Sequence, residues 1–390
     1  MFAAFKLRRN ILKGAVALGA AAILAACEPI AVSTGPSVNP NKPVPVALLV
    51  PRGSTATGDA LLAKSLENAA RLAMTDLDGV QIDLRVYDTA GDAATAQTVA
   101  LKAVGDGAKI ILGPVRSGPT NAVGVALAGK GVNVLSFSNN TSIAGGNVFV
   151  LGTTFKNTAD RLARFAARNG KSRIVTVHAQ NVAGAAGREA IAIALAANGG
   201  SNAGSVGYEF SQQGVVAAVD DIRDTVRRTG ADAIFMTSDT SGSLPLFSQL
   251  LPEAGLRPDS VQYIGLTRWD IPAQTLDLPG VQGGWFAMPD PALTGQFRDR
   301  YSAAYSAAPH PIGGLAYDGI AAIGALIKQG KSNALTTTAL TQGAGFKGVN
   351  GIFRLRADGT NERGLAVATI RDKQVVIIDP APRSFGGTGF

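Results

Sequence analysis

The chain has 390 residues, of which 46% are hydrophobic and 6% aromatic, so it is long enough for two domains with cores of their own. A charged content of only 16%, together with 47 glycines, is typical of a compact α/β protein and excludes a disordered chain. The formal net charge of +8 gives little support to a nucleic-acid partner, because no basic run with interleaved aromatic residues follows Cys27 and four basic residues precede it: Lys6, Arg8, Arg9 and Lys13.

Residues 1–26 have the pattern of a secretory signal, with a basic start and an apolar stretch, 14–24, that is too short to span a bilayer. The segment ends in Leu24-Ala25-Ala26-Cys27, which resembles a bacterial lipobox, where the cysteine is acylated and becomes the new N-terminus. An incidental cysteine after a signal peptide is the alternative. Cys27 is the only cysteine, so no disulfide is available. Arg8-Arg9 also resembles a twin-arginine signal, which leaves the export route open.

Glu28 follows the lipobox-like cysteine. In lipoproteins of two-membrane bacteria an Asp at this position commonly marks inner-membrane retention, so Glu28 favours the outer membrane over the inner one. Four prolines between residues 28 and 43 predict an extended segment, so we expect 27–43 to be a lipidated tether. The expected location is therefore lipid-anchored and facing the periplasm.

Strand-like and helix-like stretches alternate after the tether at the spacing of βα units. The first series is predicted to contain strands at 46–50, 82–86, 110–112, 132–137 and 148–151, and helices at 60–77, 95–104 and from 119 onward.

Polar loops follow two of these strands. Ile110-Ile111-Leu112 ends at Gly113-Pro114, and the next apolar run ends in the cluster 138–142, Ser-Asn-Asn-Thr-Ser. Both loops leave the carboxyl ends of parallel strands, where ligands bind in open α/β sheets. Their hydroxyls, amides and free backbone N–H groups suit a small polar or anionic molecule. Ordinary turns of the same composition are the alternative.

A second series begins after Gly152. Its predicted strands are 174–177, 206–210, 233–237 and 261–266, and its predicted helices are 158–167, 188–197, 216–228 and 244–254. The remainder is expected to add a strand at 284–288, helices at 296–307 and 314–329, antiparallel strands at 349–355, 366–371 and 375–379, and a frayed tail at 381–390. Two series of about 110–130 residues each predict two lobes.

Seven short motifs, in order from about residue 44 to 378, resemble the type I periplasmic binding proteins of the Leu/Ile/Val (branched-chain amino-acid) receptor branch. They are the run from Val46, Glu67-Asn68-Ala69-Ala70, Tyr87-Asp88-Thr89, Ile111-Leu112-Gly113-Pro114, Val134-Leu135-Ser136-Phe137-Ser138, Gly284-Trp285-Phe286-Ala287 and Leu315-Ala316-Tyr317-Asp318. Within that branch the chain looks most like lipoproteins named penicillin-binding protein activators.

The resemblance implies an α/β fold of two Rossmann-like lobes joined by three crossovers, with the ligand between the lobes and hinge closure around it. Lobe 1 would comprise 44–152 and 287–345, and lobe 2 would comprise 153–286 and 346–380. The crossovers would lie near residues 152–157, 283–289 and 343–349.

Ligand-binding positions carried over from the family come from strand-end loops in both lobes. In the receptors, hydroxyls and N–H groups hold an α-carboxylate and an acid holds the α-amine; Asp239 is the candidate acid here. Lobe 1 would contribute Ser54, Thr55, Arg116, Ser117, Gly118, Ser138, Asn139 and Asn140, and lobe 2 would contribute His178, Gln180, Asp239, Thr240 and Trp269.

One position departs from the receptor pattern. Amino-acid receptors carry a Tyr-Gly pair after the first strand of the second lobe, and the Tyr contacts the ligand, whereas this chain has Ala183-Gly184. Loss of the phenol removes a hydrogen bond and leaves space. Either the ligand is different or larger, or the cleft is not a high-affinity receptor.

An enzyme is the rival class, but its signals are missing from the sequence. His178 and His310 are the only imidazoles, no acid stands beside either in a motif, and there is no Walker loop, G-x-S-x-G or H-E-x-x-H. We expect no cofactor and no metal. Two functions remain: a receptor that binds a small polar or zwitterionic, amino-acid-like solute for an ABC permease, or an outer-membrane lipoprotein that regulates a peptidoglycan synthase.

Overall fold

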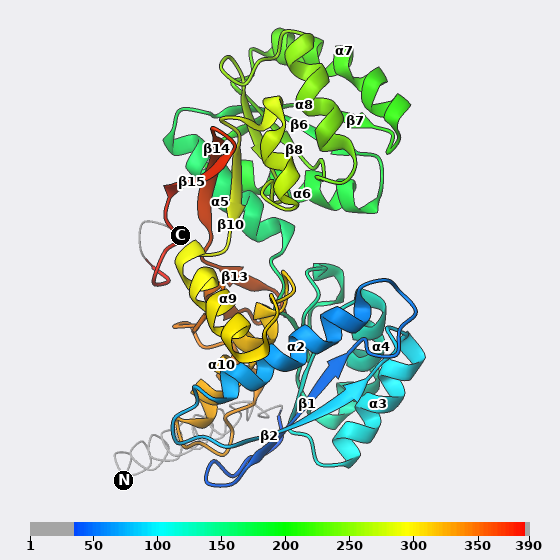
Figure 1. The fold of residues 1–390 in the computed structure, drawn as a ribbon, viewed down its shortest axis with the longest axis vertical. Helices are drawn as coiled ribbons and strands as arrows, with labels where there is room; N and C mark the ends of the chain where they lie inside the picture. The colour runs from blue at the N-terminus through cyan, green and yellow to red at the C-terminus, as the bar shows by residue number, and fades with distance from the viewer. Residues whose placement is uncertain (1–34, 387–390) are drawn as a thin grey trace, which may run out of the picture. The chain divides into compact units, whose positions relative to one another are not determined.

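The computed structural model describes residues 35–386, which form one compact unit. The predicted signal segment, Cys27 and Glu28 lie outside the described residues. The unit contains one parallel sheet and one mixed sheet, each covered by helices, and a small antiparallel sheet (Figure 1).

The sheet of the first lobe has five parallel strands in the order β2-β1-β3-β4-β5. Alternate residues of β1 enter different cores: Val46, Leu48 and Val50 lie on one face, and Ala47 and Leu49 on the other. Burial on both faces explains why β1 and β3 are apolar runs in the sequence, whereas the edge strand β2 is only partly buried and alternates apolar with polar residues. The strands are β1 (Val44–Val50), β2 (Ile82–Asp88), β3 (Ile110–Leu112), β4 (Val134–Ser136) and β5 (Val148–Val150).

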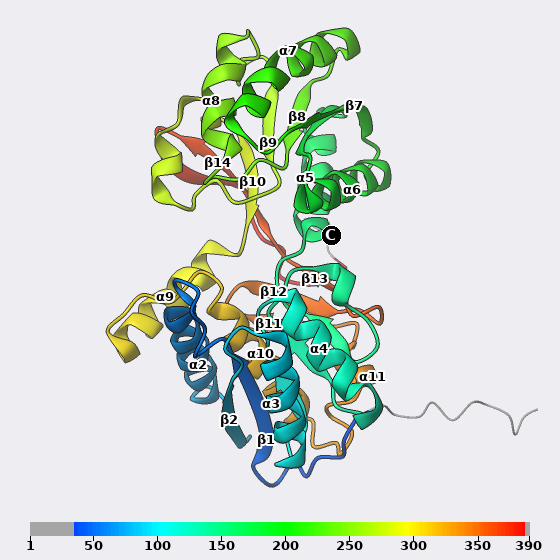
Figure 2. The ribbon, with the colours of Figure 1, turned by 90° about the vertical axis from the view of Figure 1, so that its right-hand side faces the viewer.

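Helices from distant parts of the chain cover this sheet. On one face α2 (Asp59–Met74) packs beside α9 (Pro291–Tyr305) and α10 (Gly314–Ile327), as the two ribbon views show (Figures 1 and 2). The other face is covered by α3 (Ala93–Gly105) and α4 (Ser117–Leu127). The first lobe is therefore completed by a segment that follows the second lobe in sequence.

The second lobe has a seven-stranded sheet in the order β15-β14-β10-β9-β8-β6-β7, in which β14 runs antiparallel to β10. One face is covered by α5 and α6, the other by α7 and α8. The elements are α5 (Phe155–Arg168), β6 (Arg173–Ala179), α6 (Val182–Ala197), β7 (Ser201–Tyr208), α7 (Gln212–Thr229), β8 (Ala233–Met236), α8 (Ser243–Glu253), β9 (Gln262–Gly265), β10 (Trp285–Met288), β14 (Ala366–Arg371) and β15 (Gln374–Asp379).

The third crossover differs from the expected position. Residues 346–363 form the small sheet of β11 (Phe346–Gly348), β12 (Gly351–Leu355) and β13 (Asn361–Arg363), preceded by α11 (Thr337–Leu340). Phe346 and Phe353 lie in the same core as α10, so this sheet belongs to lobe 1. The chain crosses only at Gly364–Leu365, and Leu365 enters the lobe 2 core. Strands of three residues carry too little periodicity to show this in the sequence.

Helix α6 begins six residues before the predicted start. Asn181 caps it, with its side-chain oxygen accepting from the Gly184 amide at 2.7 Å. A Cβ on Gly184 would stand 2.0 Å from the Ala179 carbonyl oxygen, so only glycine permits this close approach to β6. The glycines that make the segment look like a loop thus let the helix pack.

Both ends of the described unit are packed rather than extended. Val38 is 5% exposed in the lobe 1 core, and its amide donates to the Ser332 carbonyl at 2.9 Å. In the expected tail the ring of Phe385 lies 4.5 Å from the Arg354 guanidinium. The part of the predicted tether from residue 35 onward is therefore attached to lobe 1. Among residues 35–386, no helix is long and apolar enough to cross a membrane.

Candidate ligand-binding site

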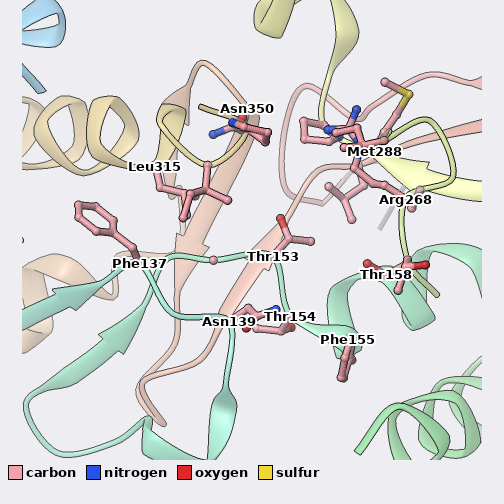
Figure 3. Close-up of a pocket in the computed structure, with 18 of the residues that line it drawn as sticks. Phe137, Asn139, Thr153, Thr154, Phe155, Thr158, Arg268, Met288, Leu315 and Asn350 are labelled. Carbon is pink, nitrogen blue, oxygen red and sulfur yellow. The ribbon is translucent and has the colours of Figure 1, made fainter. Parts of the chain in front are cut away.

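A cavity of about 410 Å³ lies where the chain crosses between the lobes, and residues of all three crossovers line it (Figure 3). Thr153 and Thr154 belong to the first crossover, Met288 to the second and Leu365 to the third. A molecule bound here would touch the segments about which the lobes can move relative to each other.

Apolar side chains from both lobes make up most of the lining. Figure 3 shows Phe137 and Leu315 of lobe 1 on one side of Thr153 and Met288 on the other. The remaining apolar residues are Val115, Phe155, Leu266, Ile271, Ala287, Pro289, Pro311, Ile312 and Leu365. Such walls favour a ligand with an apolar body.

The start of α5 supplies the main polar wall. Thr154 caps the helix: its hydroxyl accepts from the Asn157 amide at 3.2 Å, while the Asn157 side chain accepts from the Thr154 amide at 2.9 Å. Among the described residues, the amide of Phe155 and the hydroxyl of Thr153 have no hydrogen-bond partner. Because a helix N-terminus carries a partial positive charge, this wall suits an anionic group.

Two further polar side chains in the lining are already engaged. Arg268 donates from Nε to Asp270 Oδ1 at 2.9 Å and makes a second bond to the same carboxylate. Asn350 donates to Asp318 Oδ2 at 3.0 Å. The described lining contains no carboxylate: Arg268 and Asn350 belong to it, but their partners Asp270 and Asp318 do not. An ammonium group inside the cavity would therefore have no charged partner.

A buried ion pair anchors the crossovers to lobe 1. Arg363 Nη1 lies 3.1 Å from Asp318 Oδ2, and the two side chains are 2% and 0% exposed. Arg363 also donates from Nε to the Leu151 carbonyl at 2.8 Å, and Asp318 accepts from the Val349 amide at 2.8 Å. These bonds join the end of β5, the end of β13 and helix α10 into one unit.

A second arginine anchors the crossovers to lobe 2. Arg161 of α5 donates from Nε to the Leu365 carbonyl at 2.7 Å and from Nη1 to Asp379 Oδ2 at 2.9 Å. Its side chain is 6% exposed, and burial lowers the pKa of Arg161 despite the neighbouring carboxylate. Each lobe thus holds the third crossover through a buried guanidinium.

The family follows from comparison with known proteins. A family model described as periplasmic binding protein matches residues 43–374, most of the chain. The chain belongs to the periplasmic binding protein family. Comparison with curated proteins finds no match.

Solved structures of similar fold cover nearly all of this periplasmic binding protein. A branched-chain amino acid ABC transporter periplasmic ligand-binding protein from Burkholderia xenovorans is 18% identical, with a TM-score of 0.68 over 86% of this chain and 96% of its own. A substrate-binding protein from Desulfitobacterium hafniense in complex with leucine is 18% identical (TM-score 0.63; 86% and 100% covered). A solute-binding protein from Rhodopseudomonas palustris in complex with benzoate is 17% identical (TM-score 0.58; 90% and 99%).

These likenesses confirm the predicted type I periplasmic binding protein fold with two lobes. At identities below 20% they establish the fold alone. The resemblance to penicillin-binding protein activators stays a prediction.

Of the predicted lobe 1 residues, Ser138 and Asn139 line the cavity of this periplasmic binding protein. Ser138 is buried, and its hydroxyl accepts from the amide of Asn140, which itself lies outside the lining. Arg116 is engaged elsewhere, because its guanidinium binds the buried Asp59 through bonds of 2.8 and 2.6 Å. Four other predicted residues lie outside the lining: Ser54, Thr55, Ser117 and Gly118.

The predicted lobe 2 residues lie outside this cavity. His178, Gln180 and Asp239 stand at strand ends as expected but do not line it, so the cavity gives no support to Asp239 as an ammonium partner. Thr240 contacts a lining residue without lining the cavity itself: its hydroxyl donates a hydrogen bond to the carbonyl of Ile271 at 2.8 Å.

Trp269, which was also predicted for the ligand site, lies outside the described lining. Its side chain is 0% exposed within the lobe 2 core. A Cβ on Gly265 or Gly284 would stand 2.3 Å from its ring, so the indole occupies space that these two glycines leave open. Trp269 is a packing residue.

Sequence reasoning missed four polar residues of the lining: Thr153, Thr154, Thr158 and Arg268. One signal was available. Thr154 followed three residues later by Asn157 is a helix-start pattern. It placed the start of α5, and hence its free amide, directly after the first crossover.

Proposed function

We propose that this chain is a non-enzymatic, extracytoplasmic solute-binding protein of the ABC-transporter type. Its ligand is a small molecule with an apolar body and a carboxylate, bound in the cavity at the crossovers and delivered to a permease. The observation that carries the proposal is one cavity that combines apolar walls from both lobes with the free N-terminus of α5.

The chemistry of the lining separates a simple acid from an amino acid. Both leucine and benzoate, the ligands of two similar proteins, carry a carboxylate on an apolar body. The first-turn amide of Phe155 and the hydroxyl of Thr153 match the carboxylate. No carboxylate in the described lining matches an ammonium, and Ala183 stands where amino-acid receptors place Tyr. We therefore favour an acid without an α-amine over the expected zwitterion.

Binding to the folded state raises stability by RT ln(1 + [L]/Kd), about 2.7 kcal/mol at a hundredfold excess over Kd. Benzoate and 3-phenylpropanoate should therefore raise the melting temperature of the purified protein, whereas benzylamine and benzamide, which lack the carboxylate, should not. Thr153→Val keeps the side-chain volume and removes the hydroxyl, and we expect about a tenfold weaker Kd by calorimetry. Thr98→Val, at an exposed position of α3, is the matched control and should bind as the parent does.

Failure of the screen has a defined meaning. If no acid or amino acid shifts the melting temperature and a peptidoglycan synthase is recovered with the protein from membranes, the receptor function is wrong. The fold would then serve as the scaffold of a regulator.

We also propose that Cys27 is acylated and holds the protein at a membrane, in line with an extracytoplasmic family. Cys27→Ala should move the protein from the membrane fraction to the soluble periplasmic fraction. A variant that stays with the membrane as the parent does would rule out the lipobox.

A further inference from the structure

A second cavity of about 280 Å³ adjoins the first, and the two share part of their lining. The shared residues are Arg268, Ile271, Met288, Pro311 and Asn350. Met288 has a long, rotatable thioether side chain in this partition, so the partition can yield there to a ligand that extends through it. The other residues of the second cavity are Asp270 and residues from α9 and from the segment that leads into α10.

The second cavity carries an excess of positive charge. Its described lining includes Arg268, Arg298 and Asp270. Asp270 is bound by Arg268 through two bonds, whereas Arg298 has no ion-pair partner in residues 35–386. An uncompensated guanidinium at a cavity wall is suited to a carboxylate, which it can bind through two parallel hydrogen bonds.

His310 adds a neutral polar group to the same wall. Its Nδ1 accepts from the Ile312 amide at 3.3 Å, which leaves Nε2 to donate a hydrogen bond. Burial lowers the pKa of His310, so the imidazole is uncharged at neutral pH. The positive charge at this end of the site therefore comes from Arg298.

We propose that the two cavities form one extended site for a dicarboxylate with an apolar middle. One carboxylate binds at the start of α5, the apolar chain passes the partition of Met288 and Arg268, and the second carboxylate binds Arg298 and His310. This inference rests on the proposed function, because it assigns the ligand class of the same site.

Matched pairs of acids test the second carboxylate. Adipate, suberate and sebacate are compared by calorimetry with hexanoate, octanoate and decanoate on the full chain. At least one diacid should bind about tenfold more tightly than its matched monoacid, as expected for one added charge-assisted contact. Arg298→Gln should remove that advantage and leave the monoacid Kd unchanged, while Arg298→Lys should keep part of it.

Arg227→Gln is the control for net charge, because Arg227 is exposed in the last turn of α7 and lines neither cavity. It should leave every Kd unchanged. If monoacids bind and no diacid binds more tightly than its matched monoacid, the extended site is wrong and the proposed function stands. The same conclusion follows if Arg298→Gln leaves the tighter binding of a diacid unchanged. If neither these acids nor benzoate and 3-phenylpropanoate bind, the proposed function fails and the extended site fails with it.

Discussion

The two lobes hold the crossovers with the same residue type in different surroundings. In lobe 1, Arg363 and Asp318 are 2% and 0% exposed, and backbone and amide groups surround the carboxylate. In lobe 2, Arg161 is 6% exposed, but its partner Asp379 is 25% exposed and also bound by Arg168. The desolvation of a charge, more than its pairing distance, decides what its loss costs. Loss of the Arg363–Asp318 pair in lobe 1 should therefore lower the free energy of unfolding more than loss of the Arg161–Asp379 pair in lobe 2.

The largest effect should come from breaking the lobe 1 pair. Asp318→Ala leaves Arg363 charged and buried without a counter-ion, and we expect it to lower the free energy of unfolding by about 3–5 kcal/mol. Urea unfolding followed by circular dichroism measures the loss. Adding Arg363→Met removes the stranded charge and should recover much of the stability. A loss below about 1 kcal/mol for Asp318→Ala would show that the pair is not desolvated as described.

The corresponding change in lobe 2 should be milder. Asp379→Asn removes one partner of Arg161 but leaves its bond to the Leu365 carbonyl, and water can reach the site. We expect a loss of about 1–2 kcal/mol in the same unfolding experiment. Asp277→Asn, which disturbs an exposed pair with Lys373, is the control and should change nothing measurable. If Asp379→Asn lowered the free energy of unfolding as much as Asp318→Ala does, the two attachments would not differ in desolvation as described.

The smallest effect concerns Asp59 and Arg116, at the sheet edge of lobe 1. Hydrogen bonds from Arg116 lower the pKa of the Asp59 carboxyl in the folded state. This stabilisation is complete above the usual aspartate pKa and disappears as the pH falls through the lowered folded-state value. Because Arg116 is 44% exposed, Asp59→Asn should cost only about 0.5–1 kcal/mol at neutral pH. The difference in the free energy of unfolding between parent and variant should become smaller as the pH is lowered. A difference that grows in acid would contradict a lowered pKa of Asp59.

The strands were predictable because burial on both faces makes them unbroken apolar runs, as in Val46–Val50. The helix start at Val182 was not, because the glycines that let α6 approach β6 have the composition of a loop. Ser138 and Asn139 were found since they end a strand. Thr153 and Arg268 were missed because their place depends on how separate segments meet at the crossovers. A local sequence pattern carries no information on which distant segments come into contact. For the same reason the sequence does not show that Gly265 and Gly284 make room for Trp269.

The late position of α10 in the chain has a consequence for the order of assembly. The second lobe has all five of its parallel strands and both helical layers once residue 288 has been made. The first lobe, although it begins earlier, has only α2 on one face of its sheet until α9, α10 and the small sheet follow. Both lobes therefore wait for late segments during synthesis: α9, α10 and the small sheet for the first lobe, and β14 and β15 for the second. A chain cut short after residue 290 would lack α9 and α10 of the first lobe, and β14 and β15 of the second.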